Sequence, residues 1–260
     1  MIIIQPIGGL CNRMRAIGSA MILAEKRGEK VQVYWKVAPE LGCPFEELFE
    51  KPAAFSLVNY HSDYYPPKMF RQLTSRRLGN DEIRSVRTGE GLPDDFIKTL
   101  PGRLYIATEE HFYPNRDYSA FVPQKRHLDK VSALTGPASH LIGVHIRRTD
   151  NKPAIGKSST DAFLAAMEAE IAADPDVRFY LATDDLSEEK TLREHFPGRI
   201  ISNEGRDLSR DSVTGIQDAL VDLYSLSRCS KIIGSFYSSF TDLAADIRGI
   251  PLIVAGEEKA

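Results

Sequence analysis

The stretch that decides the fold spans residues 141–150 and reads Leu141-Ile142-Gly143-Val144-His145-Ile146-Arg147-Arg148-Thr149-Asp150. Its apolar first part predicts a buried strand, and two arginines follow that strand directly. Ligands of open parallel sheets collect beyond the carboxyl ends of the strands. Because two guanidinium groups suit a pyrophosphate, this strand end predicts an anion site. The alternative is a solvent-facing loop in which Arg148 pairs with Asp150.

The sequence after residue 139 alternates between strand and helix patterns. Its apolar runs predict strands at 141–146, 177–182, 199–202, 231–234 and 251–254. Helices are expected at 162–173, 187–196 and 240–247, and apolar residues recur at helical spacing at Ile216, Leu220, Leu223 and Leu226. This alternation is typical of βα units, so we expect a doubly wound parallel sheet.

The first half opens in the same way. A strand is expected at 1–6, a turn at 8–13, a helix at 14–26 and a strand at 31–35, whereas 36–130 shows no pattern that orders its elements. The turn at Thr135-Gly136-Pro137 is the best boundary. The prediction is an α/β protein of two Rossmann-like lobes, with an N-terminal lobe at 1–138 and a C-terminal lobe at 139–260.

Composition excludes several classes of protein. The 260 residues include 33 Lys and Arg against 36 Asp and Glu, a net charge of -3 that provides no overall field for a nucleic acid. The basic stretch at 68–87 makes an RNA-binding role a third possible class, but Asp81 and Glu82 interrupt that stretch. No apolar run approaches the ~20 residues of a membrane helix, so we expect a cytoplasmic protein without a span. Three widely spaced cysteines predict neither disulfides nor structural zinc.

Polar residues also follow two other predicted strands. Asp184 and Asp185 are placed to hold a base or a ribose. The alternative is that they cap the following helix, a role that suits Asp185 at least as well. Since adjacent carboxylates are not the spaced Asp-x-Asp pattern, we expect no metal. Ser238 and Ser239 lie where a helix N-terminus receives phosphate oxygens, and the alternative for either is a simple N-cap.

Two further aspartates lie four residues apart on one face of a predicted helix. Asp218 is expected on a solvated helix edge, and Asp222 is the ligand candidate of the pair.

These motifs resemble the fucosyltransferase superfamily, which includes α1,6-, nodulation-type and protein O-fucosyltransferases. Residues 143–150 are similar to its His-x-Arg-Arg motif, and 180–185 to its Tyr-Leu-Ala-Thr-Asp-Asp strand end. Residues 222–239 keep the family's spacing from an acidic helix residue to a Phe-x-Ser-Ser turn. Residues 8–13 are similar to the superfamily's Gly-Gly-Leu-Gly-Asn-Gln loop, but depart from it at Cys11 and Arg13.

The resemblance implies a GT-B-like fold whose donor, GDP-fucose, lies in the cleft between two lobes. It implies inverting transfer to the hydroxyl of a glycan or glycoconjugate, without metal or cofactor. The C-terminal lobe would hold the donor, and the N-terminal lobe would face the acceptor. Arg147 would grip the β-phosphate and serve as the catalytic residue.

The resemblance also assigns roles to the other donor-binding residues. His145 and Arg148 would contact the nucleotide or support Arg147, and Asp222 would contact guanine. Asp184 would face ribose or sugar. The remaining donor-binding residues are Ser238 and Ser239 at phosphate and Asn12 and Arg13 from the other lobe.

The residues leave the catalytic base unassigned. Glu109, Glu110 and His111 are candidates, but a solvated acidic turn is the simpler interpretation. Two alternatives to the fucosyltransferase also stay open, namely a non-catalytic nucleotide-binding protein and a transferase for another nucleotide sugar.

Overall fold

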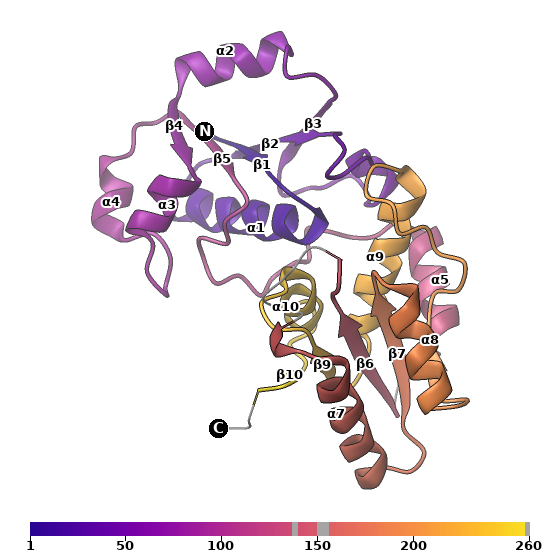
Figure 1. Cartoon of the computed structure of the whole chain (residues 1–260). Helices are drawn as coiled ribbons and strands as arrows, with labels where there is room; N and C mark the ends of the chain where they lie inside the picture. Colours follow the sequence, from indigo (N-terminus) through magenta and orange to yellow (C-terminus); the bar gives the residue numbers. More distant parts are fainter. Residues whose placement is uncertain (137–139, 150–155, 258–260) are drawn as a thin grey trace. The chain divides into compact units, whose positions relative to one another are not determined.

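The computed structural model describes residues 1–136, 140–149 and 156–257, and the chain divides into two compact units. The first unit comprises Met1–Gln124 and Ser209–Gln217, and the second comprises Lys125–Leu208 and Asp218–Ala260. Each contains a five-stranded sheet (Figure 1). The sequence analysis drew one boundary after residue 138. The structure instead groups helix α5 (Lys125–Thr135) with the second unit.

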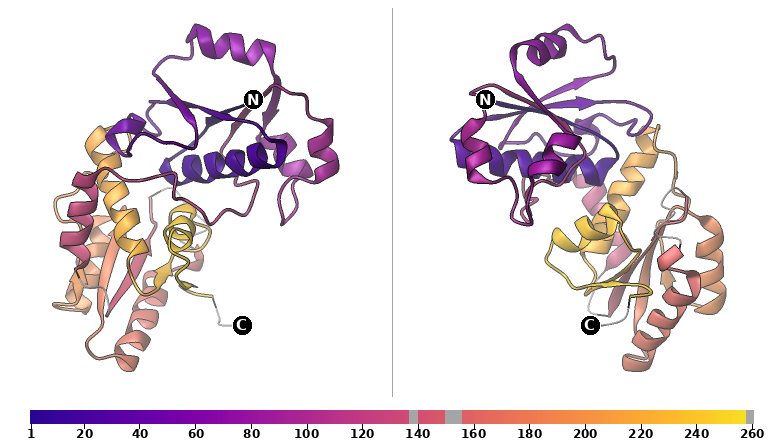
Figure 2. Two further views of the ribbon diagram at one scale, coloured as in Figure 1. Left: turned by 180° about the vertical axis from the view of Figure 1, so that it is seen from behind. Right: turned by 60° about the vertical axis from the view of Figure 1, so that its left-hand side comes forward.

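The sheet of the first unit is parallel and has the strand order β3-β2-β1-β5-β4. Its strands are β1 (Ile2–Pro6), β2 (Val31–Lys36), β3 (Ser56–Tyr60), β4 (Arg76–Gly79) and β5 (Leu104–Thr108). Its helices are α1 (Leu10–Arg27), the 3-10 turn η1 (Phe45–Glu47), α2 (Pro66–Thr74), α3 (Asn80–Val86) and α4 (Asp94–Thr99). Helix α1 lies on one side of this sheet and α2 on the other (Figures 1 and 2).

Helix α1 begins earlier than the sequence analysis expected. Gly8 has φ of 79°, a left-handed conformation that glycine adopts without strain, and it turns the chain directly after β1. Residues from Leu10 on are therefore helical rather than part of a turn. The helix ends at Gly28, whose N–H bonds back to the last turn in a left-handed cap.

The second unit has the order β10-β9-β6-β7-β8, and all its strand pairs are parallel. Its strands are β6 (Leu141–Ile146), β7 (Arg178–Thr183), β8 (Ile200–Ile201), β9 (Ile232–Gly234) and β10 (Leu252–Val254). Its other helices are α7 (Thr160–Ala173), α8 (Leu186–His195) and α10 (Ser239–Asp246), together with α9 (Val213–Ser227) from Asp218 on, because residues 213–217 belong to the first unit. The predicted α/β class and parallel sheets are confirmed. In chain order this is the Rossmann arrangement, whose direction reverses between β6 and β9.

Strand β6 is the centre of the second core. All of its residues are buried. Val144 and Ile146 pack in a cluster with Phe163 and Met167 of α7, and burying each such side chain contributes about 1.5–3 kcal/mol. At Gly143 an added Cβ would meet Leu226 at 2.9 Å, so the strand and α9 pack too closely for a side chain there.

Candidate functional site

The carboxyl ends of β6 and β9 meet at the point where the strand order reverses. Ser235, directly after β9, donates from both its N–H (3.1 Å) and its hydroxyl (3.2 Å) to the His145 carbonyl. The Arg147 N–H in turn donates to the Ser235 hydroxyl oxygen at 2.9 Å. One buried serine therefore fixes Arg147 beside the turn that leads into α10. The sequence analysis missed Ser235, although its place at a strand end was a usable signal.

Arg147 keeps part of its side chain at the surface of the second unit. Its Nη1 lies 3.3 Å from Oδ2 of Asp184, and each side chain is about one-fifth exposed. Asp184 also accepts the Arg148 N–H (2.8 Å) and the Thr149 hydroxyl (2.6 Å). The carboxylate of Asp184 thus shapes the loop after β6 and orients the Arg147 guanidinium.

The β9–α10 turn begins at Ser235, whose hydroxyl holds the Arg147 backbone, and leads to the N-terminus of helix α10. Ser238 occupies the N-cap position, but its side chain makes no capping hydrogen bond. Tyr237 has a φ of 52°, a conformation that costs energy for a residue with a side chain, and is 80% exposed. The first N–H groups of a helix have no intrahelical acceptor and favour an anion. The turn can therefore receive a phosphate group, and the Arg147 backbone is held at its first residue.

Lys157 brings a further cation to this turn. Its Nζ lies 4.0 Å from the centre of the Phe236 ring. The adjacent Ser158 accepts the Phe236 N–H and donates to the Ala255 carbonyl. The sequence analysis missed Lys157, because no spacing pattern connects it with the β9–α10 turn.

His145 lies beneath the turn rather than on its surface. Its Nδ1 is 2.6 Å from the Thr241 hydroxyl, and its ring stacks on Phe240 at 4.7 Å. Burial, followed by the nearby Arg147 charge, lowers the pKa of His145 to about 3. The neutral imidazole therefore supports the first turn of α10.

Arg148 points away from Arg147 despite being its neighbour. It donates to Glu188 (2.6 Å), to the Ser158 carbonyl (2.9 Å) and to Thr160 (3.3 Å). Its side chain is 10% exposed. The pairing of Arg148 with Asp150, the alternative raised by the sequence, lies outside the described residues. The geometry makes Arg148 a support of the loop that follows β6.

Asp185 caps helix α8. Its side chain accepts the Ser187 N–H, so the capping alternative holds for this residue.

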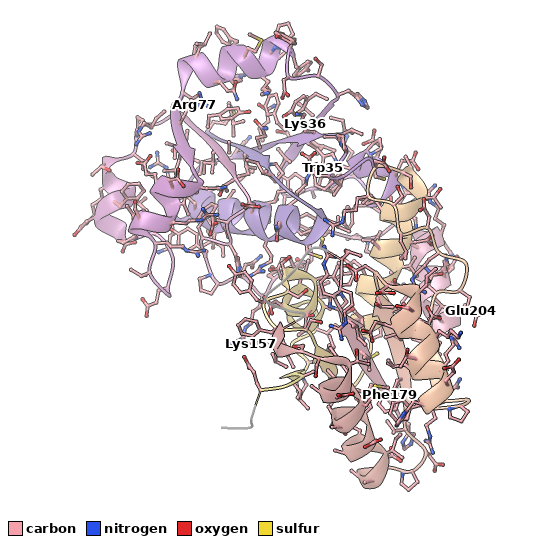
Figure 3. All side chains as sticks on the ribbon, in the orientation of Figure 1. Trp35, Lys36, Arg77, Lys157, Phe179 and Glu204 are labelled. Atoms are coloured by element: carbon pink, nitrogen blue, oxygen red, sulfur yellow. The ribbon has the colours of Figure 1, made fainter. Side chains whose placement is uncertain are left out.

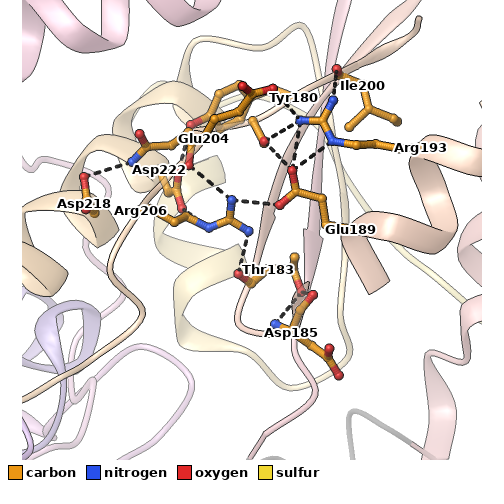
Figure 4. A network of polar contacts seen from close by, with 12 residues as sticks. Tyr180, Thr183, Asp185, Glu189, Arg193, Ile200, Glu204, Arg206, Asp218 and Asp222 are labelled. Carbon is orange, nitrogen blue, oxygen red and sulfur yellow. Dashed lines mark hydrogen bonds and ion pairs between the residues drawn. The ribbon is translucent and has the colours of Figure 1, made fainter. Parts of the chain in front are cut away.

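Asp222 belongs to a buried polar network between β7 and α9 (Figure 4). Its Oδ1 accepts the Tyr180 hydroxyl at 2.7 Å, and its Oδ2 lies 3.9 Å from Nε of Arg206. Burial raises the pKa of Asp222 to about 7. Arg206 also pairs with Glu189 and donates to the Thr183 carbonyl. The sequence analysis missed Arg206 and the Tyr180 hydroxyl, since buried polar partners leave no periodic signal.

Asp218 contradicts the expectation of a solvated helix edge. It is 7% exposed and accepts from Lys130 (2.7 Å), Asn203 (3.1 Å) and the Asp207 N–H (3.0 Å). The apolar residues Ile216, Leu220 and Leu223 of α9 are buried, and the adjacent face of the helix, which carries Asp218, is buried with them. These hydrogen bonds, including the ion pair with Lys130, replace the contacts with water that the carboxylate loses on burial.

In the first unit, Arg13 is fully buried. Its Nε donates to the Gly8 carbonyl (2.7 Å), and its Nη1 donates to the Lys36 carbonyl. Its guanidinium lies over the Trp35 ring, and both Trp35 and Lys36 belong to β2 (Figure 3). Burial lowers the pKa of Arg13 to about 10. Asn12 is half-buried in the first turn of α1.

The turn at 109–111 is not a solvated acidic turn. Glu110 is only 10% exposed and pairs with Arg84 (2.6 Å) and Arg87 (2.9 Å). His111 accepts the Asn115 N–H and lies 3.1 Å from Arg15, and burial lowers its pKa to about 4. Much of the basic stretch at 68–87 is therefore neutralised within the unit.

The described residues hold neither a metal-binding cluster nor a membrane-spanning helix. Within 1–136, 140–149 and 156–257, no group of three or more His, Cys, Asp or Glu side chains is arranged to hold a metal ion. None of the helices in those ranges combines the length and the apolar character that crossing a membrane requires.

The fold defined by the two parallel sheets is fucosyltransferase-like. NodZ α1,6-fucosyltransferase, in a crystal soaked with GDP-fucose, superposes with a TM-score of 0.65 at 18% identity, over 95% of this chain and 92% of NodZ. A mutant of Arabidopsis thaliana FUT1 in complex with GDP gives 0.63 and 15%, over 96% of this chain and 69% of FUT1. POFUT1 in complex with GDP-fucose gives 0.56 and 11%, over 96% of each chain. No family model matches the sequence, and no curated protein matches it.

Proposed function

We propose that the protein is a glycosyltransferase that moves fucose from GDP-fucose to a hydroxyl of a glycan or glycoconjugate. The observation that carries the proposal is the position of Arg147, whose N–H is held by Ser235 at the start of the turn into α10, at the strand reversal of a Rossmann-like unit. NodZ has been solved after soaking with GDP-fucose and after co-crystallisation with GDP, and POFUT1 in complex with GDP-fucose, which supports the same donor here.

The diphosphate of the donor would bind between the Arg147 guanidinium and the first turn of α10. Ser238 and Ser239 would contact phosphate oxygens with hydroxyl and N–H groups. Asp184 would keep Arg147 oriented and lie toward the ribose or sugar. His145 would hold the α10 turn in place without carrying charge itself.

Transfer with inversion needs the acceptor on the sugar face opposite GDP. The acceptor oxygen bonds to the anomeric carbon while the bond from that carbon to the β-phosphate oxygen breaks, and the acceptor proton passes to a base or to solvent. Negative charge then grows on the departing diphosphate. Preorganised donors aimed at such charge typically contribute about 3–4 kcal/mol each. Arg147 and the α10 N–H groups would supply this stabilisation without a metal.

The first unit is proposed to face the acceptor, with the donor in a cleft between the units. The expected contribution of Asn12 and Arg13 to the donor site stays a prediction. A direct contact from Arg13 would require its guanidinium to leave the Gly8 and Lys36 carbonyls.

Asp222 is proposed to select guanine. A carboxylate accepts from both the ring N–H and the exocyclic amine of guanine, a donor pair that adenine and uracil lack. In this structure Oδ1 of Asp222 is bound to Tyr180 and the residue is 6% exposed. Base binding therefore requires the side chains around Asp222 to rearrange.

Guanine selection predicts unequal ligand stabilisation. GDP at ~100 times its Kd should stabilise the fold by about 2.7 kcal/mol, which corresponds to a melting shift of roughly 5–10 °C for a chain of this size. ADP and UDP at the same concentration should shift it much less. Asp222→Asn should reduce the GDP shift more than the other two, whereas the matched Asp218→Asn variant should keep the preference. Equal shifts for all three nucleotides would remove the guanine assignment.

The same assignment predicts a pH dependence. With a pKa of about 7, Asp222 is mostly protonated at pH 6 and mostly ionised at pH 8. Only the ionised form accepts both guanine donors, so GDP-fucose affinity should rise about tenfold over this range. Calorimetric titration should use GDP-fucose, because the terminal phosphate of GDP itself titrates near pH ~6. A rise of the same size in Asp222→Asn would assign the effect to another group.

A further inference from the structure

Helix α2 of the first unit has its polar and apolar faces reversed relative to an ordinary surface helix. Such a helix turns its apolar face toward the core. In α2 the buried side chain is Lys68, which lies 3.0 Å from Asp63 and 5.3 Å above the Tyr60 ring. One turn later, Gln72 lies near the phenol of the buried Tyr105. The side of α2 that faces the sheet is therefore polar.

The outward face of α2 is apolar. Met69 is 43% exposed, Phe70 60% and Leu73 85%, and Tyr64 just before the helix is 86% exposed. The described residues include ten exposed large hydrophobic side chains, and four of them fall in this single stretch. Scattered exposed apolar residues are normal, but a contiguous group marks an interaction site. We call Tyr64, Met69, Phe70 and Leu73 the α2 patch.

Two arginines lie close to the α2 patch. Residues 61–77 contain four Lys or Arg and one Asp. Lys68 pairs with Asp63 and Arg76 pairs with Glu82, so Arg71 and Arg77 carry the remaining positive charge. Arg71 lies on α2, and Arg77 lies on β4 at the C-terminal end of that helix (Figure 3). Neither forms an ion pair within the part of the chain that the structure describes. We therefore expect this surface to bind a partner that offers both apolar groups and negative charge.

We propose that the α2 patch docks on the surface of an anionic lipid bilayer. A short helix with large apolar side chains on one side and Arg nearby lies in the plane of the headgroups and inserts the apolar side. Each Arg adds attraction to anionic lipid. A second copy of the chain fits less well, since a symmetric pairing through this face would bring Arg71 and Arg77 close to their own copies. Docking of this kind would place the protein at a membrane surface.

Flotation with lipid vesicles tests the proposal. The full-length protein should float with vesicles that contain phosphatidylglycerol and much less with pure phosphatidylcholine. The double variant Phe70→Ser/Leu73→Ser should lower the partition coefficient by at least about tenfold. Arg71→Gln/Arg77→Gln should lower it about fivefold for each charge. The control Val122→Ser/Leu208→Ser changes side chains that are 49% and 40% exposed elsewhere, and it should partition like the wild type.

Three outcomes would overturn the proposal, provided that the variants melt like the wild type. The first is no flotation with either vesicle. The second is flotation that the α2 variants do not change. The third is a concentration-dependent dimer that Phe70→Ser/Leu73→Ser abolishes without any vesicle binding, which would assign the patch to a second copy. Because the assay needs no sugar donor, its result is independent of the proposed transferase activity.

Discussion

Replacement of Arg147 by lysine is expected to reduce GDP-fucose-dependent transfer by ~100-fold or more and to leave the melting temperature unchanged. Lysine keeps the charge but lacks the planar fork that makes two contacts with phosphate oxygens. Loss of one preorganised contact to a developing anion typically costs about 3–4 kcal/mol of transition-state stabilisation. The fold should tolerate the change, because Asp184 keeps its bonds to the Arg148 N–H and to Thr149.

The Arg147→Lys experiment compares kcat/KM for GDP release with an accepted glycan, alongside thermal melting. Asp185→Ser serves as a control, since it alters a nearby strand end but keeps a capping residue for α8. Turnover close to the wild type in folded Arg147→Lys would remove Arg147 from the catalytic role.

The neighbouring variant Arg148→Met is expected to act on stability instead. Glu188 is 12% exposed and would lose the guanidinium that lies 2.6 Å away. Removing one partner of a buried ion pair typically costs about 3–5 kcal/mol. At roughly 2–4 °C for each kcal/mol, the melting temperature should fall by about 10 °C. The remaining bond from Thr160 to Glu188 moderates this loss but does not neutralise the charge.

The double variant Arg148→Met/Glu188→Leu separates a structural role from a ligand-binding one. Removing both charges leaves no unpaired carboxylate, so much of the lost stability should return. Unchanged melting in Arg148→Met, combined with lost donor affinity, would instead make Arg148 a direct donor ligand.

The different roles of Arg147 and Arg148 show which features of the site can be predicted from the sequence and which cannot. Their position after an apolar strand was enough to locate the site, and β6 has the bounds that the apolar run predicts. Residue type alone did not separate their roles. Successive side chains of an extended chain point in opposite directions, so Arg147 and Arg148 could have been expected to diverge. Their partners, Asp184 and Glu188, became clear only from the fold.

Other parts of the fold have sequence patterns that predict their structure less well. Within 36–130, β4 and α4 are too short for a clear period, and the apolar residues of α2 face solvent rather than core. Helix α1 starts as early as Leu10 because Gly8 adopts a left-handed backbone conformation. The similarity of residues 8–13 to the superfamily's loop did not predict that conformation. Arg206 lies in an irregular segment, and its burial depends on partners from β7, α8 and α9.

The most direct test of the proposed activity is product formation. Purified protein, stripped with a chelator, is incubated with GDP-fucose and an array of glycans and glycopeptides, and fucosylated product and released GDP are measured together. We predict product in the wild type, equal yields with and without the chelator, and loss of product in Arg147→Lys. Activity that the chelator abolishes and Mn²⁺ or Mg²⁺ restores would contradict the metal-independent site built on Arg147 and α10. Transfer from another nucleotide sugar but not from GDP-fucose, or GDP binding without transfer to any acceptor, would contradict the fucosyltransferase assignment itself.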